Sequence, residues 1–201
     1  MKLVIATSNR GKVDEFSALL HNPALELLSL ADFPDMPDIQ EDGATFMENA
    51  LKKARTAQAY TGLSAIADDS GLVVDALNGL PGVMSARFAP TTEARNMKLL
   101  CLLRDVPDTH RTARFVCALA LVRHDGYEWT ATGFCEGIIT HEPRGIGGFG
   151  YDPLFLYEPI GKTFAELPLE IKNRISHRGK ALAAFRKAVM EEGILGSTVF
   201  R

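Results

Sequence analysis

ARFVCALALV (113–122), RHDGY (123–127) and EWTATGFCEGIIT (128–140) follow one another in the sequence and decide the fold. The first and last of these segments are typical of β-strands. Asp125-Gly126 lies between them and is a strong short-range signal for a hairpin. The sequence therefore predicts two neighbouring strands joined by a tight turn.

Segments on either side of this hairpin alternate between strand and helix patterns. LVIAT (3–7) is a short apolar run that predicts a buried strand, and residues 11–20 follow it with apolar side chains at helical spacing. Further helices are expected over 45–60, over 91–103 with Thr92 as a candidate N-cap, and over 179–190. This alternation, together with the hairpin, predicts an α/β fold with a mixed sheet.

The remaining segments are shorter. Residues 31–43 carry two prolines and several acids and predict a loop. SAIADDSG (64–71) reads as a strand that runs into an acidic turn, and LVVDAL (72–77) reads as a second strand. LFLY (154–157) has the pattern of another strand. Without a repeat or a linker, we expect one domain over residues 1–201.

The composition is that of an ordinary globular protein. Of 201 residues, 46 % are apolar and 23 % are charged, and 22 Lys and Arg against 25 Asp and Glu give a formal charge of −3. A protein that coats a nucleic-acid polymer is usually basic, so no such partner is expected. A small anionic ligand is compatible with this charge, because a few well-placed Lys and Arg suffice locally.

The three cysteines argue against a disulfide framework. Cys101, Cys117 and Cys135 form no C-x-x-C pair and stand among apolar residues, so they are expected to be buried thiols and not zinc ligands. The first residues hold too short an apolar run for a signal peptide, and no stretch reaches transmembrane length. We therefore expect a cytoplasmic protein without a membrane partner.

GIGGFGYDPLF (145–155) contains the G-x-G-x-x-G pattern of a dinucleotide-binding turn. That turn needs a strand before it and a helix opening inside it. Here Pro153 follows at once and a strand pattern comes next, so a Rossmann site is rejected. Two interpretations stay open: a glycine-rich turn between strands, or a loop that presents the aromatic face of Phe149 to a base.

ATSNRGKV (6–13) resembles the end of a P-loop but lacks its first glycine, because Ala6 stands there, and Val13 replaces the Ser or Thr after the lysine. Thr7, Ser8 and Asn9 still offer polar groups, and Lys12 falls in the first turn of the predicted helix. Helix N-termini favour anions, so the segment is a candidate phosphate site. Plain helix capping is the alternative.

Acids gather in two further segments. Glu41 and Asp42 precede the predicted long helix, Asp68 and Asp69 are adjacent, and Asp75 follows a few residues later. Neighbouring carboxylates repel unless a cation or hydrogen bonds hold them, and oxygen ligands suit Mg²⁺. The alternative is a solvated acidic turn in which Asp69 or Ser70 caps the backbone.

KNRISHRGK (172–180) is dense in hydrogen-bond donors, among them Lys172, His177 and Arg178. Such donors could read the polar edge of a base or bind phosphate. A basic helix entry capped by Ser176 is the other interpretation. Together with the acids and the aromatic loop, these donors complete what a nucleoside triphosphate hydrolase needs.

Five blocks carry a more specific resemblance: ATSNRGKVDEF, EDGATFMENALKKA, AIADDSGLVVDALNGLPGVMSARFA, GGFGYDPLF and SHRGKAL. In this order, over residues 2 to 186, they resemble the inosine/xanthosine triphosphate pyrophosphatases, which remove deaminated purine nucleotides. The resemblance implies a homodimer whose elongated, two-lobed subunit has a central mixed sheet flanked by helices and an active site in the cleft between the lobes. It also implies Mg²⁺-dependent hydrolysis of ITP, dITP and XTP to the monophosphate and pyrophosphate.

The resemblance also implies roles for particular positions. Asp69 matches the family's proton acceptor and metal-associated acid, and Glu41 and Asp68 match acids near the metal. The implied substrate contacts are Thr7, Ser8, Asn9, Arg10, Gly11, Lys12, Ser70, Phe149, Gly150, Tyr151, Asp152, Lys172, His177 and Arg178.

Two other functions compete with this one. A nucleotide-binding module without catalysis, such as a sensor, could use the same loops, although paired acids are of no use to a pure anion binder. A pyrophosphatase that acts on pyrimidine or modified nucleotides is the second alternative. A substrate panel separates these possibilities.

Overall fold

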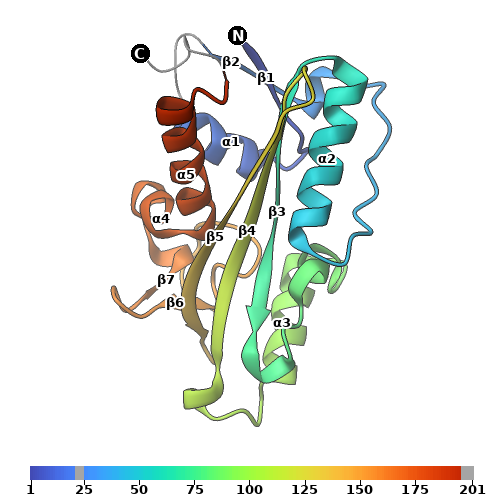
Figure 1. Ribbon diagram of the computed structural model, residues 1–201. Helices are drawn as coiled ribbons and strands as arrows, with labels where there is room; N and C mark the ends of the chain where they lie inside the picture. Colours follow the sequence, from blue (N-terminus) through green and yellow to red (C-terminus); the bar gives the residue numbers. More distant parts are fainter. Residues whose placement is uncertain (21–24, 196–201) are drawn as a thin grey trace. The chain divides into compact units, whose positions relative to one another are not determined.

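The computed structural model describes residues 1–20 and 25–195 and contains a mixed sheet flanked by helices (Figure 1). In the described residues the sheet has seven strands, in the order β2-β1-β3-β4-β5-β6-β7. The strands are β1 (Lys2–Ile5), β2 (Glu26–Ser29), β3 (Ser64–Val74), β4 (Thr112–Val122), β5 (Glu128–Ile139), β6 (Phe155–Tyr157) and β7 (Lys162–Thr163). The α-helices are α1 (Arg10–Leu19), α2 (Phe46–Thr61), α3 (Thr92–Leu102), α4 (Leu169–Ile175) and α5 (His177–Glu192). The predicted α/β fold with a mixed sheet is confirmed.

Strand directions explain why the sheet is mixed. β1 pairs in parallel with β2 and with β3, as expected where a helix such as α1 or α2 connects the strands. β6 pairs antiparallel with β5 and with β7. The predicted hairpin joins β4 to β5: the Arg123 N–H donates to the Tyr127 carbonyl at 2.9 Å, and Gly126 takes the left-handed φ of +85° that this turn requires.

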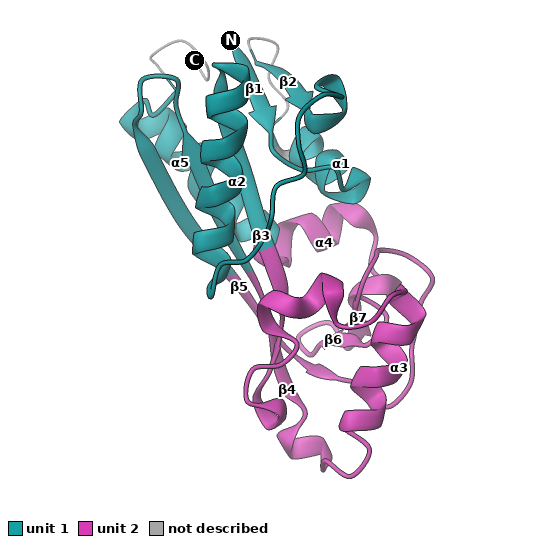
Figure 2. Ribbon diagram, turned by 90° about the vertical axis from the view of Figure 1, so that its right-hand side faces the viewer, with its two compact units in different colours: residues 1–69, 117–133, 178–201 teal, residues 70–116, 134–177 magenta. Residues whose placement is uncertain are grey.

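The chain divides into two compact units, each built from separate segments (Figure 2). Unit 1 comprises residues 1–69, 117–133 and 178–201, and unit 2 comprises residues 70–116 and 134–177. The chain passes from one unit to the other within β3, β4 and β5.

Unit 1 has a core on each face of its strands. Along β4, Cys117, Leu119 and Leu121 belong to one core with the apolar residues of α1 and α5. The alternate residues Ala118 and Ala120 belong to the other core, with the alanines of α2. Successive strand residues point to opposite faces, so an uninterrupted apolar run such as 117–122 predicts a strand covered on both sides. Figure 1 shows α2 on one side of these strands and α1 and α5 on the other.

Unit 2 has a single described core with an aromatic centre. The ring of Phe115 lies 4.6 Å from that of Phe155 and 5.7 Å from that of Phe164, centroid to centroid. Leu72, Leu99 and other apolar side chains complete this core. Aromatic pairs at these separations stabilise a core beyond the area that they bury.

Residues 64–77 differ from expectation. The predicted acidic turn at Asp68-Asp69 is wrong, because β3 runs without a break from Ser64 to Val74. Successive side chains of a strand point to opposite faces, so the two adjacent carboxylates do not face each other. Each carboxylate has cationic partners, described below, which offset the repulsion between the two.

Two smaller expectations also need correction: the cap of α3 and the burial of Cys101. Thr91, not Thr92, caps α3: its hydroxyl accepts from the Ala94 N–H at 3.1 Å. Cys101 is exposed on α3, whereas Cys117 and Cys135 are buried as predicted. Residues 169–175 form a separate helix, α4, which the sequence analysis did not expect, and Ser176 lies between it and α5. Over residues 1–20 and 25–195, no helix combines the length and the apolar character that crossing a membrane requires.

Candidate functional site

The candidate phosphate loop of unit 1 connects β1 to α1. The Asn9 side chain caps α1 by accepting from the Lys12 N–H at 3.2 Å, and the Asn9 N–H donates to the Thr7 hydroxyl at 3.2 Å. Ser8 and Arg10 are exposed, and Gly11 is partly buried. Lys12 falls in the first helical turn, as predicted, and its Nζ lies 2.9 Å from Asp68 Oδ1. The chain thus places a lysine and polar groups at a helix N-terminus, beside the acids of β3.

Arg178, the second residue of α5, holds Asp68 from another direction. Its Nε and Nη2 donate to Asp68 Oδ2 at 3.1 and 2.9 Å, and its Nη1 pairs with Glu15 of α1. All three side chains are buried. Burial by itself would lower the pKa of Arg178, but the carboxylates of Asp68 and Glu15 raise it above the ordinary value. Asp68 is therefore held in place by the guanidinium of Arg178 and the ammonium of Lys12.

Asp69 meets a different set of partners, on α2. Its Oδ2 accepts from the Asn49 amide at 2.9 Å, and its Oδ1 lies 3.4 Å from Lys53 Nζ. The same Nζ lies 2.9 Å from Glu41 Oε1. Lys53 thus connects Glu41 and Asp69, two of the three acids that the family resemblance places at the metal.

Burial and charge set the proton affinities of this group. Burial raises the pKa of Asp69 above its ordinary value, against the lowering effects of Lys53 and the Asn49 hydrogen bond. For Lys53, burial alone would lower the pKa, but Asp69, Asp68 and Glu41 raise it. Lys53 therefore stays protonated at neutral pH, and the Asp69 carboxylate holds a proton more tightly than an exposed one does.

These seven charged residues form what we call the acid–base cluster: Lys12, Glu15, Glu41, Lys53, Asp68, Asp69 and Arg178. Four carboxylates face three cationic side chains in it. An excess of carboxylate is an arrangement that a further cation would stabilise. Yet in the part of the chain that the structure describes, no three His, Cys, Asp or Glu residues gather as a ready-made metal site. Glu41 and Asp69 supply the hard oxygen donors that suit a divalent cation completed by substrate and water.

The glycine loop belongs to unit 2 and is held by Asp152. One Asp152 oxygen, Oδ2, accepts from the Phe149 N–H at 2.8 Å and from Lys172 Nζ at 2.7 Å. Asp152 and Lys172 are both buried. A Cβ on Gly148, whose φ is +70°, would stand 2.1 Å from that oxygen. Glycine is required here by the carboxylate that organises the turn, not by a dinucleotide.

This loop presents one aromatic ring and buries another. Phe149 is 38 % exposed, and Lys172 Nζ lies 4.5 Å from its ring centroid. Tyr151 is buried, and its hydroxyl donates to the Ser85 carbonyl at 3.0 Å. The Asn96 amide of α3 donates to the Gly150 carbonyl at 3.2 Å. The loop is thus anchored from several sides around the partly exposed ring of Phe149.

His177 ends unit 2 as a buried residue. Its ring stacks on Phe115, with centroids 4.8 Å apart and an interplanar angle of 13°. Its chain neighbour Arg178 opens the last segment of unit 1.

Within each unit, the structure brings together residues that are far apart in sequence. In unit 1 it gathers Lys12, Glu41, Asp69 and Arg178, and in unit 2 it gathers Phe149 with Lys172. Ser70 follows Asp69 directly in β3, as the first residue of unit 2.

Two of the other acids singled out in the sequence have separate partners. Asp75 pairs with Arg114 at 3.0 Å and accepts from the Thr112 hydroxyl at 2.7 Å. Asp42, which is exposed, pairs with Lys52 at 2.6 Å.

Three residues of the site escaped the sequence analysis: Glu15, Asn49 and Lys53. Asn49 and Lys53 are one helical turn apart, so they share a face of α2. Glu15 stands three residues after Lys12 in α1. One signal in the sequence points to Asn49 and Lys53. Both are polar, whereas the other buried residues of α2 are the small apolar Ala50, Ala54 and Ala57.

The Ham1 family profile matches residues 3–188 of this chain. The chain belongs to the Ham1 family. This confirms the resemblance that the five sequence blocks carry, since curated relatives of the chain are named dITP/XTP pyrophosphatase. One such relative, from Geobacter sulfurreducens, is 54 % identical over 196 residues, covering 96 % of this chain and 98 % of its own. Another, from Desulforamulus reducens, is 55 % identical over 185 residues, covering 90 % of this chain and 92 % of its own.

Solved structures of Ham1 proteins have the same fold. A HAM1 protein from Coxiella burnetii superposes with a TM-score of 0.87 at 42 % identity, over 95 % of this chain and 99 % of its own. The nucleoside-triphosphatase, or dITP/XTP pyrophosphatase, from Mycobacterium abscessus gives a TM-score of 0.76 at 46 % identity, over 92 % and 98 % of the two chains.

Proposed function

We propose that this chain hydrolyses the non-standard purine nucleoside triphosphates ITP, dITP and XTP to a nucleoside monophosphate and pyrophosphate. Its high identity to Ham1 proteins named dITP/XTP pyrophosphatase, over nearly the whole of both chains, carries this conclusion. The acid–base cluster supports it, because it combines lysines that can hold phosphates with carboxylates that a pure anion binder would not need.

Nucleoside triphosphate pyrophosphatases of this kind generally need a divalent metal, and we propose Mg²⁺. Glu41 and Asp69 would hold it, with Asp68 close by in the sequence. Asp68 is engaged by Lys12 and Arg178, which favours a positioning role for its carboxylate over direct ligation. When bound, Mg²⁺ would neutralise charge on the triphosphate, a contribution of several kcal/mol.

The triphosphate would lie at the N-terminus of α1. Backbone N–H groups there, with the Thr7 and Ser8 hydroxyls and the Lys12 ammonium, would donate to its phosphates. Lys172 would stabilise charge on the pyrophosphate that leaves. Water attacks the α-phosphorus, the bond to the β-phosphoryl group breaks, and Asp69 accepts the proton of the water. A general base of this kind contributes about 10²–10⁴-fold in rate.

The environment of Asp69 suits this task. A general base works best when its pKa approaches the working pH, and burial raises the pKa of Asp69 in that direction. Asn49 holds one carboxylate oxygen and Lys53 approaches the other, so the orientation of the group is fixed before substrate binds.

Recognition of the base would combine stacking with hydrogen bonds. Stacking on Phe149 contributes on the order of 1–3 kcal/mol and accepts any base. Hypoxanthine and xanthine carry the acceptor O6 where adenine carries a donor amino group. Donors from the His177–Arg178 segment would satisfy O6 and would be left without an acceptor by ATP. A mismatch of this type can discriminate by roughly 10⁴-fold.

A substrate panel tests the proposal. Purified protein with Mg²⁺ is given ITP, dITP, XTP, ATP, GTP, dUTP and a methylated UTP, and both the pyrophosphate and the nucleotide product are quantified. We expect ITP, dITP and XTP to be cleaved to monophosphate at a kcat/KM at least about 100-fold above that for ATP. Preferential cleavage of a pyrimidine or modified nucleotide would replace this function with the second enzyme alternative. Binding of ITP without turnover would indicate a sensor.

The same family resemblance leads us to propose a homodimer that acts in the cytoplasm. Sedimentation analysis at micromolar concentration checks the oligomeric state, for which a monomer mass of 21.9 kDa would be contrary evidence.

A further inference from the structure

A pocket of about 310 Å³ lies in unit 2, away from every residue assigned to the substrate. Its lining comes from α3, from the turn before β4 and from the segment after β5. The lining residues are Met97, Leu100, Cys101, Arg104, Arg111 and His141. Pockets that hold small ligands begin at about 300 Å³, so this volume suits a small molecule.

Arg111 is the unusual member of this lining. It is only 2 % exposed, and its guanidinium donates to three backbone carbonyls, those of Leu103, Ile139 and Thr140, at 2.7, 2.7 and 2.9 Å. A guanidinium has five N–H donors, so two remain beyond these three bonds. Among the residues that the structure describes, no carboxylate lies within ion-pair distance of Arg111.

Arg178 has the carboxylate partners that Arg111 lacks among the described residues. Both arginines are 2 % exposed, but Arg178 faces the carboxylates of two acids. A buried charge is costly unless an opposite charge compensates it. Burial lowers the pKa of Arg111, and the carboxylate of Asp108 only partly opposes this. The Arg111 site is thus a buried positive charge that an anion would stabilise.

The rim of the pocket adds a second guanidinium. Arg104 follows α3, and its Nη2 lies 3.8 Å from the thiol sulfur of Cys101. No described carboxylate pairs with it. Asp108, the acid nearest in the sequence to Arg111, is engaged by His141, whose Nε2 lies 2.6 Å from its Oδ1. Two guanidinium groups, those of Arg104 and Arg111, therefore line the pocket, whereas the Asp108 carboxylate is not part of its lining.

We propose that this pocket binds a small organic anion through a carboxylate or phosphate group, with the oxyanion on Arg104 and Arg111. Guanidinium groups match the geometry of both oxyanions with paired hydrogen bonds. Met97 and Leu100 would contact the apolar part of such a ligand. The site lies beyond the proposed pyrophosphatase function and does not depend on it.

Cys101 offers a direct reporter of occupancy. It lines the pocket and is exposed, whereas the two other cysteines are buried. The rate of Cys101 alkylation by the uncharged reagent iodoacetamide is measured on the intact protein, with the alkylated peptide identified by mass spectrometry. Inorganic phosphate or acetate is titrated in at constant ionic strength, maintained with chloride. The measured alkylation rate reports on the pocket that Cys101 lines, and not on anions bound at the nucleotide site.

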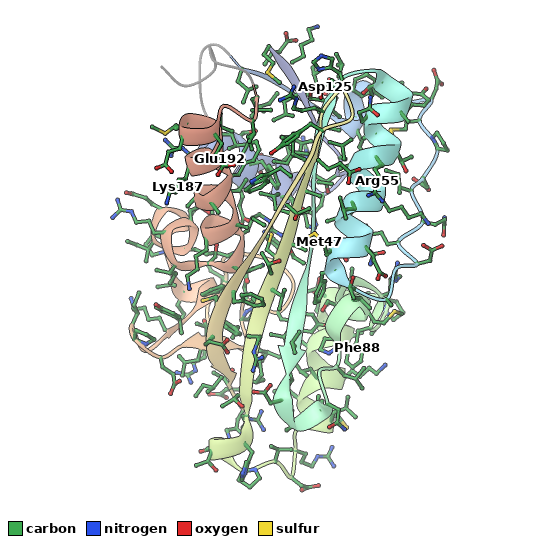
Figure 3. All side chains as sticks on the ribbon, viewed as in Figure 1. Met47, Arg55, Phe88, Asp125, Lys187 and Glu192 are labelled. Carbon is green, nitrogen blue, oxygen red and sulfur yellow. The ribbon has the colours of Figure 1, made fainter. Side chains whose placement is uncertain are left out.

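We expect one or both anions to slow the labelling of Cys101 saturably, by at least about fivefold. Protection by phosphate alone assigns the ligand a phosphate group, and protection by acetate alone assigns it a carboxylate. Arg104→Gln should abolish the protection, each rate being normalised to the anion-free rate of the same variant. The matched control is Arg55→Gln, at an exposed arginine on α2 that is labelled in Figure 3 and pairs with Glu128. Labelling that neither anion slows, or protection that survives in Arg104→Gln, would overturn the proposal.

Discussion

At the scale of the residue, the adjacent acids of β3 have opposite environments. Asp68 is bound by Lys12 and Arg178, whereas Asp69 faces Asn49 and Lys53 of α2. The separation follows from the alternation of side chains along a strand. Two neighbouring carboxylates can therefore have different tasks: Asp68 fixes the arrangement of cationic groups, and Asp69 is the one that we propose takes part in the chemistry.

Replacing Asp69 with Asn tests that division. The amide has nearly the shape of the carboxylate but cannot accept a proton, so turnover of ITP should fall by about 10²–10⁴-fold while the protein stays folded. Steady-state pyrophosphate release measures the activity, and denaturant unfolding measures the stability. Asp42→Asn is the matched control, because Asp42 is exposed and pairs with Lys52 at the surface. A near-normal kcat for Asp69→Asn would remove Asp69 from the role of base.

Arg178 allows a separate prediction at this scale. Replacing it with Met would leave Asp68 and Glu15 buried with one cationic partner fewer. Breaking a buried ion pair from one side typically destabilises a protein by about 3–5 kcal/mol. Urea unfolding should therefore show a loss of this order for Arg178→Met. A loss below about 1 kcal/mol would mean that Arg178 contributes little to the stability of unit 1.

At the scale of the element, local sequence signals placed most helices and strands well. The Asp125-Gly126 hairpin and the start of α2 after Thr45 follow the predictions closely. The error over residues 64–77 arose because partners distant in sequence decide the outcome there. β3 passes through two acids because Lys12, Lys53 and Arg178 compensate them. No pattern within residues 64–77 contains that information.

The cap of α3 gives a test of local geometry. Thr91→Ala removes the hydroxyl that accepts from the Ala94 N–H and should cost about 1 kcal/mol of unfolding free energy. The neighbouring Thr92 serves as the control, since its hydroxyl accepts from an Arg95 side chain instead. Thr92→Ala should therefore cost less in the same urea titration. Equal losses would contradict the assignment of Thr91 as the N-cap.

The glycine loop predicts a dependence of stability on alkaline pH. Burial raises the pKa of Tyr151 from 10.0 to about 12. The folded state therefore holds this proton more tightly than the unfolded state does. Stability from Tyr151 is fully present below pH 10 and is lost as pH rises toward 12, with a loss of about 1 kcal/mol by pH 11. The difference in unfolding free energy between the wild type and Tyr151→Phe should shrink by that amount from pH 9 to pH 11. A constant difference would argue against a buried, neutral phenol.

At the scale of the whole molecule, the sequence indicated the right chemistry but not the complete site. Lys12, Asp69 and Phe149 could be selected from the sequence alone, because each stands in a motif that is a contiguous stretch of the chain. Lys53, Asn49 and Glu15 were not selected, because their contacts with the other site residues form only when α1, α2 and β3 come together in unit 1. The cleft between lobes and the dimer stay predictions from the family resemblance.

The central claim is that carboxylates of the acid–base cluster, with a divalent cation, make the bond between the α- and β-phosphoryl groups of a non-standard purine nucleotide breakable. Its most direct test is the rate of pyrophosphate release from ITP by purified protein, first with excess Mg²⁺ and then with excess EDTA. The account predicts a fall of at least about 100-fold in EDTA, restored when Mg²⁺ is added back. Equal rates in Mg²⁺ and EDTA would contradict it.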